Sequence, residues 1–177
     1  MPQTARVRIA REQAKRIGAL TRDAEQLKRD LRDLVRVHRP EMLAETGCGP
    51  LTAAILIGQT AGAERFKSDA HFARLAGVAP VPVSSGRTDR HRLDRGGNRQ
   101  LNRALHVIAI TRGRLDPETR AYLQRKEAEG KTRIEAMRCL KRHLARHYHR
   151  LLSSPPVNLT REASTPGTAP TRIVCLT

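Results

Sequence analysis

The chain has 177 residues, and its 34 Lys and Arg against 17 Asp and Glu give a formal net charge of +17. Aromatic residues make up only 2% of the sequence, so its core must be aliphatic, which favours helices over a β-sandwich. The longest mainly apolar run, residues 51–57, is far shorter than the ~20 residues that span a bilayer, and the first 13 residues hold no apolar signal segment. The three cysteines are widely spaced and fit a reducing compartment. We therefore expect a mainly α, cytoplasmic protein that makes no contact with a membrane.

The excess positive charge indicates the kind of partner. Clustered Lys and Arg bind nucleic acid because they release the counterions that surround the phosphates. The alternative is a basic surface produced only by high arginine usage in a GC-rich genome. We expect DNA as a partner of this chain.

Residues 9–38 are predicted to form one long helix. Its apolar residues recur at intervals of three and four, the a/d pattern of a coiled coil: Ile17, Leu20, Ala24, Leu27, Leu31 and Leu34. An amphipathic helix that packs on its own domain would show the same pattern over so few heptads. Pro40 is expected to end the helix. We expect a homo-oligomer that assembles through this helix.

A helix-hairpin-helix is predicted next. A short helix from Met42 leads into Gly47-Cys48-Gly49, and Pro50 suits the first position of a second helix. The backbone N–H groups at such a helix start can hold a DNA phosphate without reading sequence, with Gly47, Gly49 and Thr52 as the candidate contacts. A turn that only packs the core is the alternative.

The later part of the chain shows clear helix boundaries. Ser68 can cap a helix that runs to Leu75 and is closed by Gly77, and residues 78–97 break the helical period as a loop or short β-hairpin would. Further helices are predicted from about 98 to 114, from Asp116 to Gly130, and from a capping box at residues 132–135 to about 152. The chain is expected to divide into a coiled-coil arm (1–39), a core that contains the helix-hairpin-helix (40–152) and a disordered Pro/Ser/Thr-rich tail (153–177).

The Ser-Ser-Gly-Arg segment is the strongest candidate for chemistry. Ser84 and Ser85 precede a cluster of arginines that could bind phosphate oxygens and stabilise developing charge: Arg87, Arg90, Arg92, Arg95, Arg99 and Arg103. Serine needs such help to act as a nucleophile. A basic loop that only grips the nucleic-acid backbone would contain the same residue types.

Metal-ligand patterns are weak in this sequence. His143 and His147 are spaced as two ligands on one helix could be, but no third ligand accompanies them. We read them, with His149, as solvated or phosphate-contacting, and we expect no metal site. No acidic cluster could hold a catalytic Mg²⁺.

Several ordered motifs resemble one known family. They are Gly47-x-Gly49-Pro50-x-Thr52-Ala53, Leu75-Ala76-Gly77-Val78-Ala79-Pro80, Ser85-Gly86 and Arg95-Gly96-Gly97-Asn98-Arg99-x-Leu101-x-Arg103-Ala104-Leu105. Over about residues 40–152 they look like the C-terminal domain of transposases of the insertion sequence 110/116/902 family.

The resemblance implies a reaction and its partners. Members of this bacterial family join a RuvC-like domain with a DEDD metal site to this helical domain, and they recombine DNA through a covalent serine–DNA intermediate. A structured guide RNA directs them, and they act as oligomers. The nucleophile maps to Ser85, with Ser84 as the alternative. We expect a truncated form that lacks the RuvC-like domain and its Mg²⁺ and is inactive alone. The alternative is a non-catalytic DNA- or RNA-binding or oligomerisation remnant.

Overall fold

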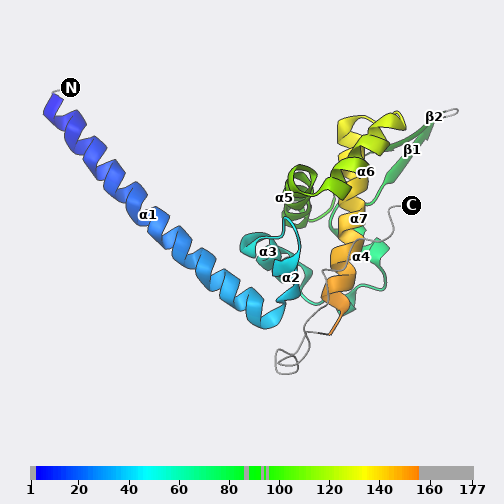
Figure 1. Ribbon diagram of the computed structural model, residues 1–177, viewed down its shortest axis with the longest axis horizontal. Coiled ribbons are helices and arrows are strands. Elements are labelled where there is room, and N and C mark those ends of the chain that lie inside the picture. The colour runs from blue at the N-terminus through cyan, green and yellow to red at the C-terminus, as the bar shows by residue number, and fades with distance from the viewer. Residues whose placement is uncertain (1–2, 86–87, 93, 95, 156–177) are drawn as a thin grey trace.

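The computed structural model describes residues 3–85, 88–92, 94 and 96–155. It is mainly helical, as the composition predicts, and one two-stranded sheet interrupts the helices. Figure 1 shows a long helix, α1, that extends as an arm from a body formed by the remaining elements. In the described part of the chain, no helix is both long and apolar enough to cross a membrane.

The arm is the helix α1, Gln3–His38, and it begins six residues before the predicted start. Only its last turns pack on the body: Val35 is buried and Leu31 half-buried, where α1 contacts α2 and α3. Ile17 and Leu27 of the predicted seam are 64% and 62% exposed. Over most of its length, the apolar seam of α1 therefore has no partner among the residues that the structure describes.

A short helix, a glycine turn and a second helix follow the arm, in the expected order. These are α2 (Glu41–Ala44) and α3 (Pro50–Thr60). Gly47 adopts a positive φ of 84°, and a Cβ at this position would lie 3.1 Å from the carbonyl oxygen of Ile108. Gly47 is thus required both for the turn and for the close approach of the turn to a later helix.

The next elements lead into the sheet. A 3-10 turn, η1 (Ala63–Arg65), precedes α4 (Asp69–Leu75), and Ser68 caps α4 as predicted. The strands β1 (Val81–Ser85) and β2 (Thr88–Arg92) then pair antiparallel, from Val81 opposite Arg92 to Ser85 opposite Thr88. Of the two forms expected for residues 78–97, a loop or a short β-hairpin, the structure shows the hairpin.

Three helices complete the body: α5 (Arg99–Leu115), α6 (Pro117–Ala128) and α7 (Arg133–Ser153). Asn98, Asp116 and Thr132 cap them, and Thr132 forms the predicted capping box with Glu135. α7 packs against α4, α5 and α6, and its buried residues contribute to the main hydrophobic core. The predicted tail lies outside the described residues from position 156 onwards.

Candidate nucleic-acid interface

The β-hairpin carries the serine pair at its far end. Ser85 belongs to the last residue pair, opposite Thr88, and Ser84 is paired with Asp89. The four residue steps from Val81 to Ser85 span about 14 Å at ~3.4 Å per residue, so Ser85 lies well away from the start of the hairpin. Figure 1 shows the hairpin extending from the body beside α6. Arg90 and Arg92 lie on β2, whereas Arg87 and Arg95 lie outside the described residues.

The start and end of the hairpin segment are held together by two glycines. Gly77 has a positive φ of 63°, and a Cβ on Gly97 would overlap the Gly77 backbone. Beside this contact, the Asn98 N–H donates to the carbonyl oxygen of Leu75 at 2.6 Å. The motifs at 75–80 and 95–105 are therefore two halves of one junction, from which the hairpin emerges.

Asn102 reinforces this junction from α5. Its Nδ2 donates to the carbonyl oxygens of Ala76 and Gly77 at 2.9 and 3.0 Å, and its Oδ1 accepts from Lys141 Nζ at 2.7 Å. One amide side chain thus connects the start of the hairpin to the central helix α7. No local sequence pattern indicates the role of Asn102, because its partners lie 25 to 39 residues away.

Arg99 and Arg103 lie near the hairpin junction. Both are exposed and stand one turn apart on α5, so their side chains share a helix face. Asn98 Nδ2 donates to Gln59 Oε1 at 2.7 Å and joins the start of α5 to the end of α3. The structure therefore brings these two arginines close to the hairpin segment in the fold.

The glycine turn lies at the other end of α5. Gly47 lies beside Ile108 and Thr111, near the C-terminal end of α5, whereas Arg99 is the first residue of that helix. At about 1.5 Å of rise per residue, roughly 18 Å along the helix axis separates Arg99 from Thr111. Gly49 is exposed and caps α3. Thr52 is buried, and its Oγ1 donates to the carbonyl oxygen of Gly49 at 3.0 Å, which favours a role in shaping the turn over a phosphate contact.

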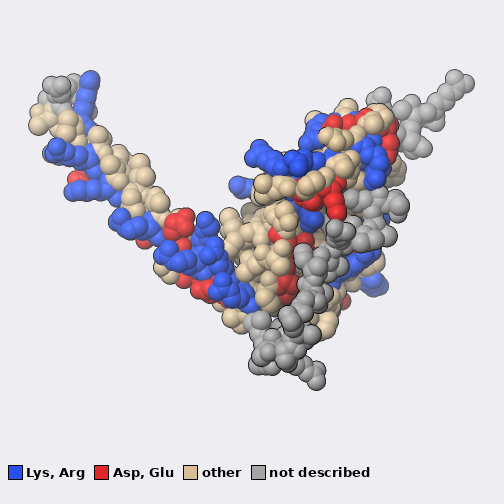
Figure 2. Space-filling model, in the orientation of Figure 1, with Lys and Arg blue, Asp and Glu red and all other residues tan. Residues whose placement is uncertain are grey.

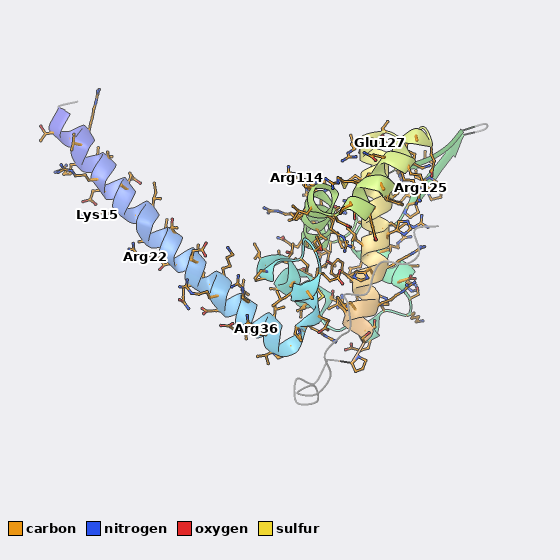
Figure 3. The ribbon with its side chains drawn as sticks, in the orientation of Figure 1. Lys15, Arg22, Arg36, Arg114, Arg125 and Glu127 are labelled. Atoms are coloured by element: carbon orange, nitrogen blue, oxygen red, sulfur yellow. The ribbon has the colours of Figure 1, made fainter. Side chains whose placement is uncertain are left out.

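Basic side chains cover large parts of the surface. Figure 2 shows Lys and Arg along α1 and a second group over the end of the body formed by α5 and α6. Figure 3 labels Lys15, Arg22 and Arg36 on the arm and Arg114 and Arg125 on the body. The positive charge is therefore spread over both parts of the molecule.

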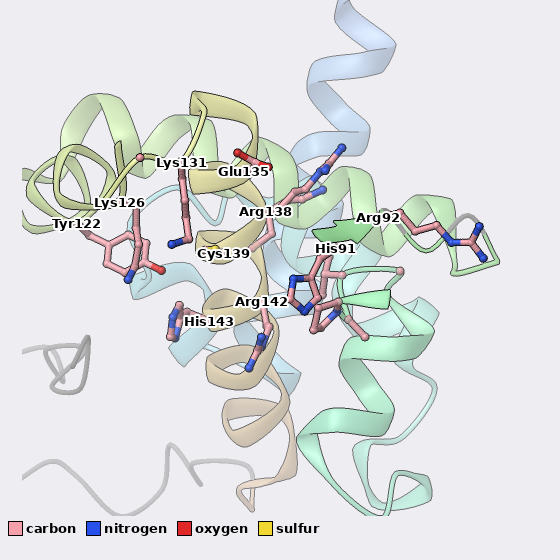
Figure 4. A pocket seen from close by; sticks show the side chains of 16 residues that line it. His91, Arg92, Tyr122, Lys126, Lys131, Glu135, Arg138, Cys139, Arg142 and His143 are labelled. Carbon is pink, nitrogen blue, oxygen red and sulfur yellow. The ribbon is translucent and has the colours of Figure 1, made fainter. Parts of the chain in front are cut away.

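A basic cavity of about 620 Å³ lies between the start of the hairpin segment, α6 and α7. Six cationic side chains and a single carboxylate, that of Glu135, line it, and Figure 4 labels five of these cations. The cations are Arg92, Lys126, Lys131, Arg138, Lys141 and Arg142. All except Arg92 are absent from the sequence-based candidates. The sequence signal that could have indicated them is the spacing of Arg138, Lys141 and Arg142 at i, i+3 and i+4 on α7.

The prediction that the three late histidines are solvated or contact phosphate is wrong for two of them. His149 is buried, with its ring 5.5 Å from that of Phe72, and His147 Nε2 lies 3.0 Å from Glu45 Oε2. Neither is a solvated or phosphate-contacting residue, because this side of α7 faces the core. His143 lines the basic cavity and packs edge-on against Tyr122 at 5.5 Å.

A partly buried polar cluster lies beneath the glycine turn. Glu45 accepts from Arg112 Nη1 at 3.2 Å, and Arg112 also contacts Asp116 at 3.6 Å. Burial acts to raise the pKa of Glu45, but His147 and Arg112 together hold it below its ordinary value. Burial raises the pKa of the Cys48 thiol to about 12, which favours the protonated thiol over the nucleophilic thiolate at neutral pH.

The described residues contain no cluster of three or more His, Cys, Asp or Glu side chains that could hold a metal ion. They therefore do not fit a catalytic Mg²⁺.

Comparison with known proteins identifies the class. Residues 42–124 match the family model described as Transposase IS116/IS110/IS902 family. The chain is similar to the insertion element IS110 uncharacterized 43.6 kDa protein of Streptomyces coelicolor, with 37% identity over 115 residues. This match covers 63% of the chain. The chain is also 36% identical over 107 residues, 59% of its length, to the insertion element IS900 uncharacterized 42 kDa protein of Mycobacterium paratuberculosis. Residues 42–124 of the body are thus similar to a domain of insertion-element transposases.

More specifically, the segment that matches the IS116/IS110/IS902 transposase model is residues 42–124, somewhat less than half of the chain. This segment contains the glycine turn, the β-hairpin, α5 and the start of the cavity wall on α6. The matches cover 28% and 27% of the two relatives, so the chain spans little more than a quarter of their length.

Proposed function

We propose that this chain acts in DNA transposition and that Ser85 is the nucleophile that attacks a DNA phosphodiester. The observation that carries the proposal is the position of Ser85 in the last residue pair of a projecting hairpin, within a segment of the transposase family. Ser84, one residue earlier on the same strand, is the alternative.

The proposed step conserves the phosphodiester. A bond forms between Ser85 Oγ and phosphorus, and the bond from phosphorus to the sugar oxygen of the neighbouring nucleotide breaks. The serine proton passes to solvent or a base, and the departing sugar oxygen takes up a proton as a free hydroxyl. Reversal of the step against a second strand would complete recombination.

The arginines near the hairpin junction support this assignment. Arg99 and Arg103 are exposed near the point where the hairpin leaves the body, and Arg92 pairs with Val81 at the start of the sheet. Guanidinium groups bind phosphate oxygens in a bidentate manner and stabilise the charge that develops on them. Arg87, Arg90 and Arg95 are proposed for the same role from their places in the sequence.

Further partners are part of the proposal. The exposed apolar seam of α1 supports assembly with a second copy of the chain. The family resemblance adds a structured guide RNA and a RuvC-like domain, which would supply the Mg²⁺ that the described residues do not hold. The chain alone would then bind nucleic acid without completing strand transfer.

Covalent trapping tests the serine. Wild type, Ser85→Ala and Ser84→Ala are incubated with labelled, nicked DNA and the matching element RNA, with and without a RuvC-like half supplied separately. We expect an adduct that survives denaturation in wild type and Ser84→Ala but not in Ser85→Ala. An adduct retained in Ser85→Ala and lost in Ser84→Ala would move the nucleophile by one residue, and an adduct kept by both variants would exclude the pair.

The second candidate is a module that holds nucleic acid without chemistry. The N-terminus of α3, which begins at Pro50 and has no side-chain cap, favours it, because backbone N–H groups at a helix start suit a backbone phosphate. No adduct in the complemented reaction, together with binding that weakens steeply with salt, would select this function.

A further inference from the structure

The basic cavity described above contains a buried cation that no carboxylate neutralises. Lys141 is only 7% exposed, and among the described residues its Nζ has one side-chain partner, the neutral Asn102. Burial and the nearby Arg138 both lower the pKa of Lys141. A buried charge is costly unless an opposite charge accompanies it, so the surroundings of Lys141 favour an anion that comes from outside the chain.

Two neighbouring cations on α7 also lack a carboxylate partner among the described residues. Within the described part of the chain, neither Arg138 nor Arg142 forms an ion pair, although Lys126 and Lys131 share Glu129 at 2.9 and 3.2 Å. Burial, followed by Arg146, Arg142 and Lys126, lowers the pKa of His143. The α7 side of the cavity therefore presents two free guanidinium groups beside the ammonium group of Lys141, an arrangement suited to phosphate oxygens.

Other residues that line the cavity suit a flat, partly polar group. Tyr122 is only 2% exposed, yet its hydroxyl has no hydrogen-bond partner among the described residues. Val78, Ala79 and Pro80 add apolar surface, and the His143 ring lies edge-on to Tyr122. The volume of about 620 Å³ falls in the roughly 300–1,000 Å³ range of small-ligand sites.

We infer that this cavity binds one nucleotide of a single-stranded nucleic acid, with its phosphate on Arg138, Lys141 and Arg142 and its base beside Tyr122 and His143. A base must leave its stack to enter such a site, so an unpaired strand fits and an intact duplex does not. The inference rests on the proposed binding of nucleic acid but not on the chemistry of Ser85.

The cavity is an anchoring site and is separate from the reacting serine. It adjoins residues 77–80 and 91–92, where the hairpin begins and ends, whereas Ser85 lies at the far end. In Figure 4 the guanidinium of Arg92 points away from the other labelled side chains. Lys141 reaches the hairpin junction through Asn102, so a nucleotide held here would fix the strand relative to the hairpin.

Binding of short strands to the full chain tests the inference. The probes are a labelled single-stranded DNA of about 12 nucleotides, the RNA of the same sequence and the DNA duplex, at one fixed salt concentration. The variant is Arg138→Gln with Arg142→Gln. The matched control is Arg120→Gln with Arg150→Gln, which removes two exposed arginines that lie outside the cavity.

We expect the cavity variant to bind the single strand about tenfold more weakly than wild type and the control to lose threefold at most, since direct contacts exceed the general charge effect. Duplex binding should fall equally in both variants. If the cavity variant loses more affinity for the RNA strand than for the DNA strand, the cavity prefers ribonucleotides, and the opposite result indicates deoxyribonucleotides. Equal losses in the cavity variant and the control would overturn the inference.

A cross-linking readout locates the base. A strand with one 5-iodouracil, irradiated with the wild-type chain, should cross-link to the peptide that contains Tyr122 or His143, and Tyr122→Phe should keep its fold and weaken binding. Cross-links confined to the arm or the hairpin would contradict the inference. If no covalent adduct forms at Ser85, this cross-link should still form. The proposal for the Ser85 nucleophile and the inference about the cavity can therefore be rejected independently.

Discussion

Lys141 Nζ donates a hydrogen bond to Asn102 Oδ1 at 2.7 Å and thereby joins the central helix to the hairpin junction. The same amide donates to the carbonyl oxygens of Ala76 and Gly77. Three polar groups in a partly buried place thus depend on one side chain. Loss of the Asn102 amide would leave the buried Lys141 ammonium group and the two carbonyl oxygens without this partner.

Replacement of Asn102 by leucine should therefore destabilise the fold. We expect Asn102→Leu to lower the free energy of unfolding by about 2–4 kcal/mol, because unsatisfied buried polar groups carry their full desolvation cost. Urea denaturation measures the loss. Gln100→Leu, an exposed neighbour on α5, is the control and should change stability little. Equal effects of the two substitutions would exclude the bridging role.

Local signals made most elements predictable from the sequence. Ser68, Asp116 and Thr132 each bond to a backbone N–H within three residues, so the caps and the helices that follow them could be read directly from short segments. The break around residues 78–97 likewise follows from its prolines and glycines. These interactions depend on sequence neighbours alone.

The parts that escaped prediction depend on distant residues. The contact between Gly77 and Gly97 joins two motifs that sequence reasoning had treated separately, and Lys141 meets Asn102 across 39 positions. His149 was misread because only the packing of α7 decides which of its sides is buried. The cavity escaped notice for the same reason, since three segments far apart in the chain form its walls.

The hairpin junction should tolerate no side chain at Gly97. A Cβ in Gly97→Ala would overlap the Gly77 backbone, and we expect a loss of about 1–3 kcal/mol of stability, the usual cost of overpacking. Thermal unfolding followed by circular dichroism measures it. Gly58→Ala is the control: no atom lies within 4 Å of its added Cβ, and alanine in the α3 interior should stabilise slightly. A Gly97→Ala protein as stable as wild type would refute the close contact.

The N-terminus of α3 offers a direct test of phosphate binding. Gly49 caps α3 at φ −76°, so Gly49→Asp and Gly49→Asn should both cap the helix well, but only Asp adds a negative charge. If a phosphate binds here, we expect Asp to weaken duplex DNA binding about tenfold relative to Asn by charge repulsion. Fluorescence anisotropy at fixed salt measures the ratio. Equal affinities would show that the turn only packs the core.

The exposed seam of α1 predicts a defined assembly. Leu20→Glu places a charge in the seam, where Leu20 is 58% exposed, whereas Ala19→Glu adds the same charge one position outside it. We expect Leu20→Glu to shift the chain to monomer, because apolar a/d positions drive coiled-coil association, and Ala19→Glu to leave the assembly intact. Sedimentation velocity separates the two results. A wild-type chain that is monomeric at all accessible concentrations would contradict assembly through α1.

The cluster beneath the glycine turn predicts an acid-dependent loss of stability. Burial acts to raise the pKa of Glu45, but His147 and Arg112 together hold this pKa below its ordinary value in the folded chain. A carboxyl group whose pKa is lower in the folded state stabilises the fold above its ordinary pKa, and this contribution disappears as pH falls through the folded value. Glu45→Gln should therefore be less stable than wild type at neutral pH, with a difference that narrows as the pH falls below about 4.5. Urea denaturation from neutral to acid pH checks this, with the exposed Glu12→Gln as control. A difference independent of pH would show that Glu45 acts through packing and hydrogen bonding alone, and not through its charge.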